Sequence, residues 1–178
     1  MKIIYVDDEQ AAVTINDIIK QVEKARLIVD APEKAVKIQT MPNFDVFVDG
    51  SRLHFKSEKA KELLALIVDR KGAGVNNDYA ITYLWENKSF DENTKSLYRM
   101  TKKNLKNILS GAGIDFILRD EGRTIYAAPG SFSCDLYNLL DGNEAAKSIF
   151  RGGYLSEYSW AEKTVAWIEK IFFERTKI

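Results

Sequence analysis

The chain has 178 residues, of which 46% are hydrophobic and 29% charged, which is the composition of a globular protein and excludes general disorder. No apolar run reaches the ~18 residues of a membrane span, and the early acidic pair Asp7-Asp8 is unlike a secretory signal peptide. A single cysteine, Cys134, excludes an intramolecular disulfide and a cysteine-based zinc site. We therefore expect a cytoplasmic protein with no membrane contact.

The net charge is zero, but its distribution along the chain is uneven. Residues 1–35 carry 5 basic and 7 acidic side chains, residues 36–130 carry 15 and 12, and residues 131–178 carry 6 and 7. Only the middle segment is positive, so this is where we expect a polyanionic partner to bind.

The first 35 residues predict a small unit of their own. Residues 2–6 are typical of a short buried strand, and residues from about Gln10 to Ala25 are typical of an amphipathic helix. Asp30–Pro32 is predicted to be a linker.

The apolar period then changes to that of strands and afterwards to that of helices. Three short strands are predicted over Val36–Met41, Phe44–Val48 and Arg52–Phe55. Asp49-Gly50 between the last two indicates a tight turn. Three helices are predicted over about Ser57–Arg70, from an N-cap at Asn76 or Asn77 onward, and over about Asn93–Leu109.

A β-hairpin is predicted to end this middle segment. Its strands are Ile114–Leu118 and Thr124–Ala127, joined by the polar turn Arg119–Arg123. A short second helix before a longer third helix is the layout of a helix-turn-helix, and the final hairpin corresponds to a wing. The sequence therefore predicts an α+β fold with a winged helix-turn-helix over residues 36–130. Residues 131–178 are predicted to form a short helical region.

The third helix carries the clearest chemical signal, because five basic residues and no acidic one lie between Lys95 and Lys106. At about 100° per residue, one side of the helix gathers Leu97, Thr101, Leu105 and Ile108, with Met100 and Leu109 at its edges. The other side gathers Lys95, Ser96, Arg99, Lys102, Lys103 and Lys106. Such a cationic face fits the major groove of DNA, where lysine and arginine neutralise phosphates.

Base recognition needs forked or amide side chains, and we expect it from Arg99, Ser96 and Asn107. Arg119 and Arg123 flank the tip of the wing, within reach of phosphates or a minor groove. The alternative interpretation is a solvated helix face. The lack of compensating acids, and the position on the third helix of the motif, favour DNA contact.

Residues 36–129 resemble the OmpR-type winged-helix domain, in the version found in SARP activators and related response regulators. The residues that carry the resemblance are Phe44–Gly50, Lys59–Ala65, Val68–Ala73 and Leu84-Trp85. The resemblance implies duplex DNA and RNA polymerase as partners and the third helix as the recognition helix. One departure is Leu105-Lys106, where the family often has Leu-Arg, and lysine lacks the bidentate fork of arginine.

Both ends of the chain resemble further parts of such regulators. Ile3–Glu9 is similar to the first strand of a CheY-like receiver domain, whose acidic pair helps to bind a divalent cation. Only about 27 residues separate Glu9 from the first predicted winged-helix strand, which is too few for a complete receiver, so we expect a remnant without a metal or phosphorylation site. Phe150–Leu155 and Ser159–Glu162 resemble the opening of a bacterial transcriptional activator domain.

The remaining candidates are predicted to be structural. His54 stands without a nearby carboxylate or serine motif, and Cys134 is typical of a small buried residue. Trp85, Trp160 and Trp167 occupy apolar helical positions and are predicted to lie in the core. No glycine-rich phosphate loop is present. We expect no enzymatic activity and no cofactor.

A second function class stays open, namely a protein-interaction or dimerisation module with weak or no DNA binding. The apolar elements of the first 35 residues cannot bury their faces alone, and they need the winged helix, the C-terminal helices or a second copy of the chain to pack on. A homodimer is one such arrangement.

Overall fold

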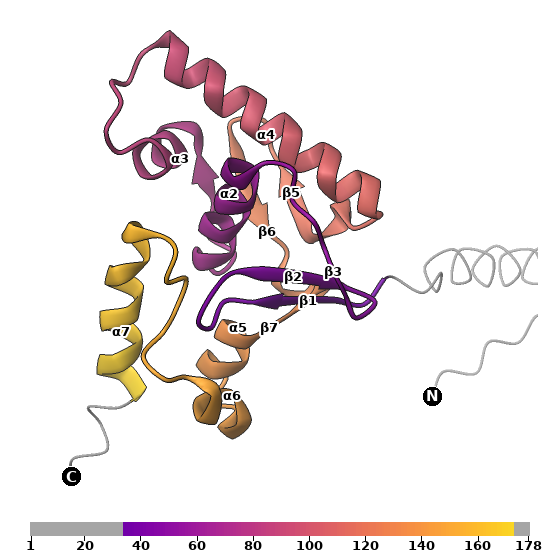
Figure 1. The fold of residues 1–178 in the computed structure, drawn as a ribbon, viewed down its shortest axis with the longest axis vertical. Coiled ribbons are helices and arrows are strands. Elements are labelled where there is room, and N and C mark those ends of the chain that lie inside the picture. The colour runs from indigo at the N-terminus through magenta and orange to yellow at the C-terminus, as the bar shows by residue number, and fades with distance from the viewer. Residues whose placement is uncertain (1–33, 173–178) are drawn as a thin grey trace, which may run out of the picture. The chain divides into compact units, whose positions relative to one another are not determined.

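The computed structural model describes residues 34–172, so the strand, helix and linker predicted over residues 1–33 lie outside the described residues. The described residues form an α+β winged-helix fold (Figure 1), as predicted. No helix within residues 34–172 is long and apolar enough to cross a membrane.

The first sheet has the strand order β3-β2-β1-β7. Its strands are β1 (Val36–Gln39), β2 (Asp45–Val48), β3 (Ser51–Arg52) and β7 (Ser133–Cys134). Asp49 and Gly50 adopt φ values of 50° and 79°, which confirms the tight turn between β2 and β3. The predicted strand over Arg52–Phe55 is wrong in its bounds, because β3 is Ser51–Arg52. One further hydrogen bond joins the Leu53 amide to the Val46 carbonyl of β2, and His54 lies exposed beyond it.

Helix α2 (Glu58–Asp69) lies at the centre of the molecule. Ser57 caps its N-terminus, because the Ser57 side chain accepts a hydrogen bond from the Ala60 amide. Every residue from Leu63 to Val68 is buried, so the second half of α2 is covered on all sides, whereas Glu58 and Lys59 in the first turn are exposed. The cluster of apolar side chains around it draws on both sheets and on the other helices.

Helix α3 (Asn77–Leu84) follows the short strand β4 (Val75–Asn76). Asn76 and not Asn77 is the N-cap, because its side-chain oxygen accepts a hydrogen bond from the Tyr79 amide at 2.8 Å. A polar segment then leads to α4, which packs against both α2 and α3.

Helix α4 (Glu92–Ala112) is longer than predicted at its C-terminal end. Gly111 is accommodated within the helix, and the chain turns only at Gly113, which has the left-handed φ of 68°. Asp91 caps the N-terminus by accepting a hydrogen bond from the Thr94 amide.

The wing consists of β5 (Leu118–Asp120) and β6 (Thr124–Ala127), and β4 pairs with β6 to complete a sheet of order β4-β6-β5. The predicted first wing strand over Ile114–Leu118 begins too early. The amide of Ile114 bonds to the Leu109 carbonyl at the end of α4, and Asp115–Ile117 form a 3₁₀ turn, η1. Regular strand geometry therefore begins at Leu118, although the Ala128 amide already donates a hydrogen bond to the Ile117 carbonyl at 2.9 Å.

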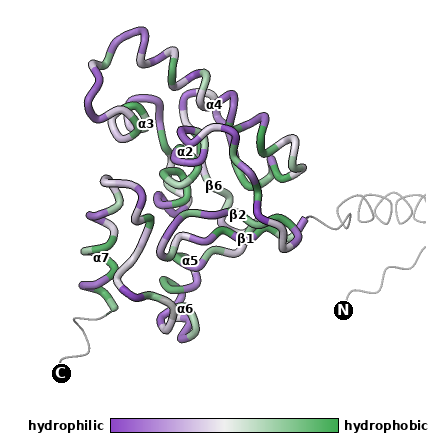
Figure 2. The backbone as a smooth tube through the Cα atoms, in the orientation of Figure 1, coloured by the Kyte–Doolittle hydropathy of each residue, from purple (hydrophilic) through white to green (hydrophobic). Residues whose placement is uncertain are grey.

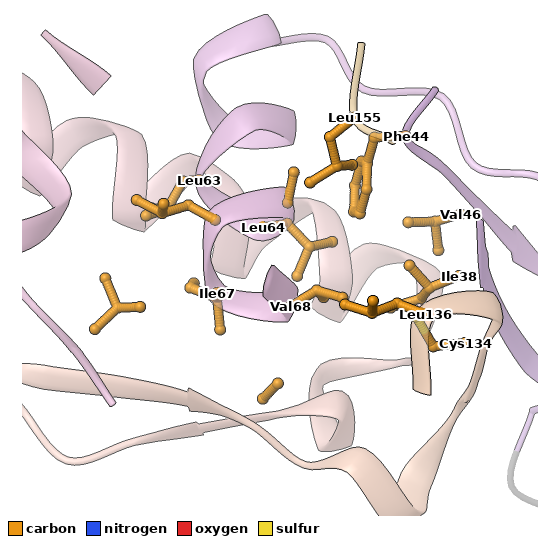
Figure 3. Packing of buried hydrophobic residues seen from close by; sticks show 14 of the residues in the cluster. Ile38, Phe44, Val46, Leu63, Leu64, Ile67, Val68, Cys134, Leu136 and Leu155 are labelled. Carbon is orange, nitrogen blue, oxygen red and sulfur yellow. The ribbon is translucent and has the colours of Figure 1, made fainter. Parts of the chain in front are cut away.

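The described C-terminal segment is largely helical, as predicted. Its elements besides β7 are η2 (Pro129–Ser131), α5 (Asp135–Leu140), α6 (Glu144–Ile149), η3 (Ser159–Ala161) and α7 (Glu162–Phe172). The segment shares the core of the winged helix. Figure 3 shows Leu136 and Leu155 of this segment beside Leu64 and Val68 of α2.

The three tryptophans differ in environment. Trp160 is buried and Trp85 is half-buried against the core, in agreement with the prediction. The prediction is wrong for Trp167, which is 37% exposed. Its face of α7 is open to solvent, and there the Lys71 ammonium group lies over the Trp167 ring, 4.5 Å from the ring centroid.

Asp135 joins the C-terminal segment to the first sheet. Its carboxylate accepts hydrogen bonds from the amides of Thr40 and Met41 at 2.8 and 2.9 Å, and from the Thr40 hydroxyl at 2.6 Å. Both Thr40 and Met41 are buried, so no solvent replaces these bonds. The contact fixes α5 beside the end of β1.

We predict that Asp135→Ala lowers the free energy of unfolding by about 3 kcal/mol, because the amides of two buried residues lose their acceptor. Urea denaturation followed by circular dichroism measures the change. Asp141→Ala, at an exposed position after α5, is the matched control and should change stability by less than about 0.5 kcal/mol. Equal stability of the two variants would contradict the role of Asp135.

Candidate nucleic-acid interface

The orientation of α4 decides which of its side chains can meet DNA. Its buried residues are Thr94, Tyr98, Thr101, Leu105 and Leu109. The predicted centre of the core face is therefore wrong by part of a turn, because Leu97 and Ile108 are only half-buried whereas Tyr98 is 2% exposed. The large Tyr98 ring packs inward and draws that side of the helix towards the core. Along α4 the backbone alternates between hydrophilic and hydrophobic residues (Figure 2), as expected for a helix with one buried face.

The opposite face of α4 is open. Ser96, Arg99, Lys103 and Asn107 are all exposed there, at the helical spacing of one stripe. Met100 lies beside them with 56% of its surface exposed, so its predicted place at the edge of the core is wrong. An exposed apolar side chain in this stripe has the chemistry to contact a thymine methyl group. The pattern of basic residues in the sequence does not predict this role.

Lys102 and Lys106 do not point freely into solvent. The Lys102 ammonium group donates to Asp120 of the wing at 2.7 Å and to the Gly122 carbonyl at 2.7 Å. The Lys106 ammonium group donates to the other oxygen of the Asp120 carboxylate at 3.0 Å. The lysine side chains are 14% and 57% exposed, respectively. The expectation of a strip without compensating acids is therefore wrong, because the fold supplies a carboxylate from a distant part of the chain.

Asp120 joins the wing to α4 through its ion pairs with Lys102 and Lys106. Its carboxylate also accepts a hydrogen bond from the Gly122 amide, which closes the tip of the wing. Partial burial raises the pKa of Asp120, but hydrogen bonds and positive charge from Lys102 and Lys106 outweigh that effect, and the net pKa is lowered. Asp120 is therefore ionised at neutral pH, and both lysines remain paired.

The first turn of α4 contains a second ion pair. Lys95 donates to Glu92 at 2.8 Å, and a guanidinium nitrogen of Arg99 lies 4.0 Å from the same carboxylate. The hydrogen bond and charge of Lys95 lower the pKa of Glu92. Because Glu92 is 77% and Arg99 65% exposed, water screens these pairs strongly, and DNA phosphates can compete for Arg99.

The two wing arginines differ. Arg119 pairs with Glu121 at 2.9 Å and lies over the Tyr126 ring at 4.7 Å from its centroid. Arg123 is exposed at the wing tip and, like Lys103, makes no ion pair with any residue in the range 34–172. Lys103 and Arg123 are thus the predicted contacts whose charge is not offset by a bound carboxylate.

His54 and Cys134, which the sequence predicts to be structural, lie in different surroundings. His54 is exposed, and Cys134 is buried, with a thiol pKa raised to about 12 chiefly by that burial. Within the described part of the chain, no three His, Cys, Asp or Glu side chains are grouped so as to hold a metal ion. The receiver-like Asp7 and Asp8 lie outside the described residues.

Comparison with known proteins gives a structural neighbour. No protein-family model and no curated protein sequence matches the chain. Among solved structures, EmbR of Mycobacterium tuberculosis, in complex with a low-affinity phosphopeptide, is similar with a TM-score of 0.62 and 21% sequence identity. The match covers 78% of this chain and 42% of the EmbR chain. This similarity supports the winged-helix fold, and the chain spans less than half of the length of that protein.

We predict that Lys102→Met raises the pKa of Asp120, because it removes a hydrogen bond and a positive charge while leaving the carboxylate partly buried. Carboxyl ¹³C shifts followed against pH measure the pKa. The ion pairs stabilise the fold above pH ~3.9, the pKa of an unpaired aspartate, and this stabilisation is lost as the pH falls through the lowered pKa.

Lys163→Met, on the exposed surface of α7, is the control for that titration. An unchanged pKa of Asp120 in Lys102→Met would show that the wing is not fastened to α4 in the way described.

Proposed function

We propose that this protein binds duplex DNA in a sequence-specific manner and regulates transcription, with α4 in the major groove and the wing on the adjacent backbone. The observation that carries the proposal is the exposed stripe of α4, in which Arg99 and Lys103 face solvent while Tyr98, Leu105 and Leu109 anchor the helix. A helix held from one side and cationic on the other has the shape and charge that the groove accepts.

The exposed side chains divide into two chemical groups. Lys103 and Arg123 are suited to phosphates, because neither charge is committed to a carboxylate among residues 34–172. Arg99, Ser96 and Asn107 are suited to base edges, since they offer forked, hydroxyl and amide hydrogen-bonding groups. The first group supports affinity for any sequence, and the second supports discrimination between sequences.

The wider setting of this activity is also proposed from the family resemblance. We place the protein in the cytoplasm, as an OmpR/SARP-like relative of two-component response regulators that acts with RNA polymerase. The receiver-like segment lacks room for a complete receiver, which supports regulation without phosphorylation. A homodimer and the start of an activator domain at the C-terminus are further parts of the same proposal, as is the absence of enzymatic activity.

The test is a salt titration of the full chain on a mixed-sequence duplex. We expect Arg99→Ala and Lys103→Ala each to weaken binding and to flatten the slope of log affinity against log salt by about one unit, because each removes one positive charge from the surface that would face the duplex. Lys163→Ala, in exposed α7, is the matched control and should leave the slope unchanged. If neither α4 variant differs from the control, a protein-interaction or dimerisation module becomes the better interpretation.

Asp120→Asn tests the role of the wing carboxylate in the opposite direction. Loss of this charge releases Lys102 and Lys106 for phosphates, so we expect tighter non-specific binding and a salt slope steeper by up to about two units. Asp141→Asn removes one negative charge at an exposed position after α5 and controls for the change in net charge. An identical slope in both variants would mean that the two lysines do not reach the DNA.

A further inference from the structure

A cavity of about 460 Å³ lies where the start of α3, the first half of α4 and the wing strand β6 meet. Three of the residues that line it are cationic, namely Lys95, Arg99 and Arg123, and Asp78 is the acidic residue among them. Lining residues of net positive charge attract an anion. The first turn of α3 supplies part of the wall, and the N-terminus of a helix adds a partial positive charge.

Two buried polar atoms belong to residues that line this cavity and have no hydrogen-bond partner among residues 34–172. They are the hydroxyl oxygen of Tyr98 and the side-chain oxygen of Asn77. Tyr98 is only 2% exposed, so water does not serve its hydroxyl as it would at the surface. Buried polar groups in folded proteins are almost always paired, and an unpaired one calls for a specific explanation. A ligand in the cavity provides that explanation for both atoms.

The chemistry of these two groups favours a ligand rich in acceptor oxygens. Burial, and to a smaller degree the negative charge of Asp120, raise the pKa of Tyr98 to about 12, so its hydroxyl keeps its proton and acts as a donor at neutral pH. A rotation of the Asn77 side-chain amide by 180° exchanges its oxygen and nitrogen. The amide then places an N–H donor where the unpaired oxygen was. Two neutral donors beside three cations match a phosphate group.

We propose that this cavity binds one phosphate group, and that the phosphate comes from the DNA backbone. Tyr98 and Asn77 donate hydrogen bonds to it, and Lys95, Arg99 and Arg123 supply the charge. The inference rests on the proposed function for the source of the phosphate, because the same Arg99 and Arg123 belong to the exposed surface that would face the duplex. Tyr98 would thereby act as a positioning residue that sets where α4 lies along the DNA backbone.

The test compares Tyr98→Phe with Tyr83→Phe in the full chain. Tyr83→Phe removes the hydroxyl of a half-buried tyrosine in α3 that does not line the cavity. We expect Tyr98→Phe to weaken binding of a mixed-sequence duplex by about tenfold, the effect of one hydrogen bond to a charged group, with an unchanged salt slope because no charge is removed. Its Tm should not fall, since the hydroxyl has no partner within the described protein. Asn77→Ala should weaken binding in the same way.

A second arm titrates inorganic phosphate against the Tm of each variant, which separates the source of the phosphate from the site. If the wild type binds the duplex and both cavity variants bind it equally well, the inference is overturned while the proposed function stands. If the wild type does not bind the duplex, but inorganic phosphate raises the Tm of the wild type and not the Tm of Tyr98→Phe, the cavity is a phosphate site. The proposed function then fails. If neither ligand distinguishes Tyr98→Phe from Tyr83→Phe, the cavity has no such role. A Tm of Tyr98→Phe below that of the wild type would assign the hydroxyl a structural role instead.

Discussion

The second half of α2 holds the fold together, because other elements bury it on every side. Six consecutive residues, Leu63–Val68, are shielded from water, whereas Glu58 and Lys59 in the first turn are exposed. A helical segment that is apolar all round is stable only when other elements surround it. The first sheet, α3, α4, the wing and the C-terminal segment all contribute to that cover. The position of α4, and with it the exposed stripe, therefore follows from packing around α2 and not from any property of α4 alone.

Asp120 has the corresponding importance for the candidate interface. A single carboxylate from the wing holds two lysines of α4, which rigidly joins the two parts that would contact DNA and at the same time reduces the charge available to phosphates. The Lys102–Asp120 pair is partly shielded from water, so salt screens it less than the pairs on the open surface. The ion pairs of Asp120 would thus fix the angle between helix and wing but lower the affinity for DNA. Lys103 and Arg123, which make no ion pair among residues 34–172, would then supply a larger share of the electrostatic attraction.

Much of the fold could be predicted because local chemistry specifies it. Asp49-Gly50 has the φ preferences of a tight turn, and the Asn76 position offers an N-cap oxygen. The errors occur where a non-local contact outweighs the local pattern. Tyr98 turns inward although its neighbours suggest a different core face, and Trp167 stays at the surface although its helical position is apolar. The 3₁₀ turn after α4 delays the first wing strand for the same kind of reason.

Periodicity, capping residues and charge are properties of neighbouring residues, so they predict the order of the elements, the winged helix-turn-helix layout and the basic character of the helix after the turn. Which of those basic residues lack an ion pair among residues 34–172 depends instead on how distant elements pack. Asp120 meets Lys102 and Lys106 across 14 to 18 positions of sequence, and Asn77, Tyr98 and Arg123 meet at one cavity from three different elements. Such contacts depend on how the elements pack in space, so the spacing of residues along the chain does not predict them.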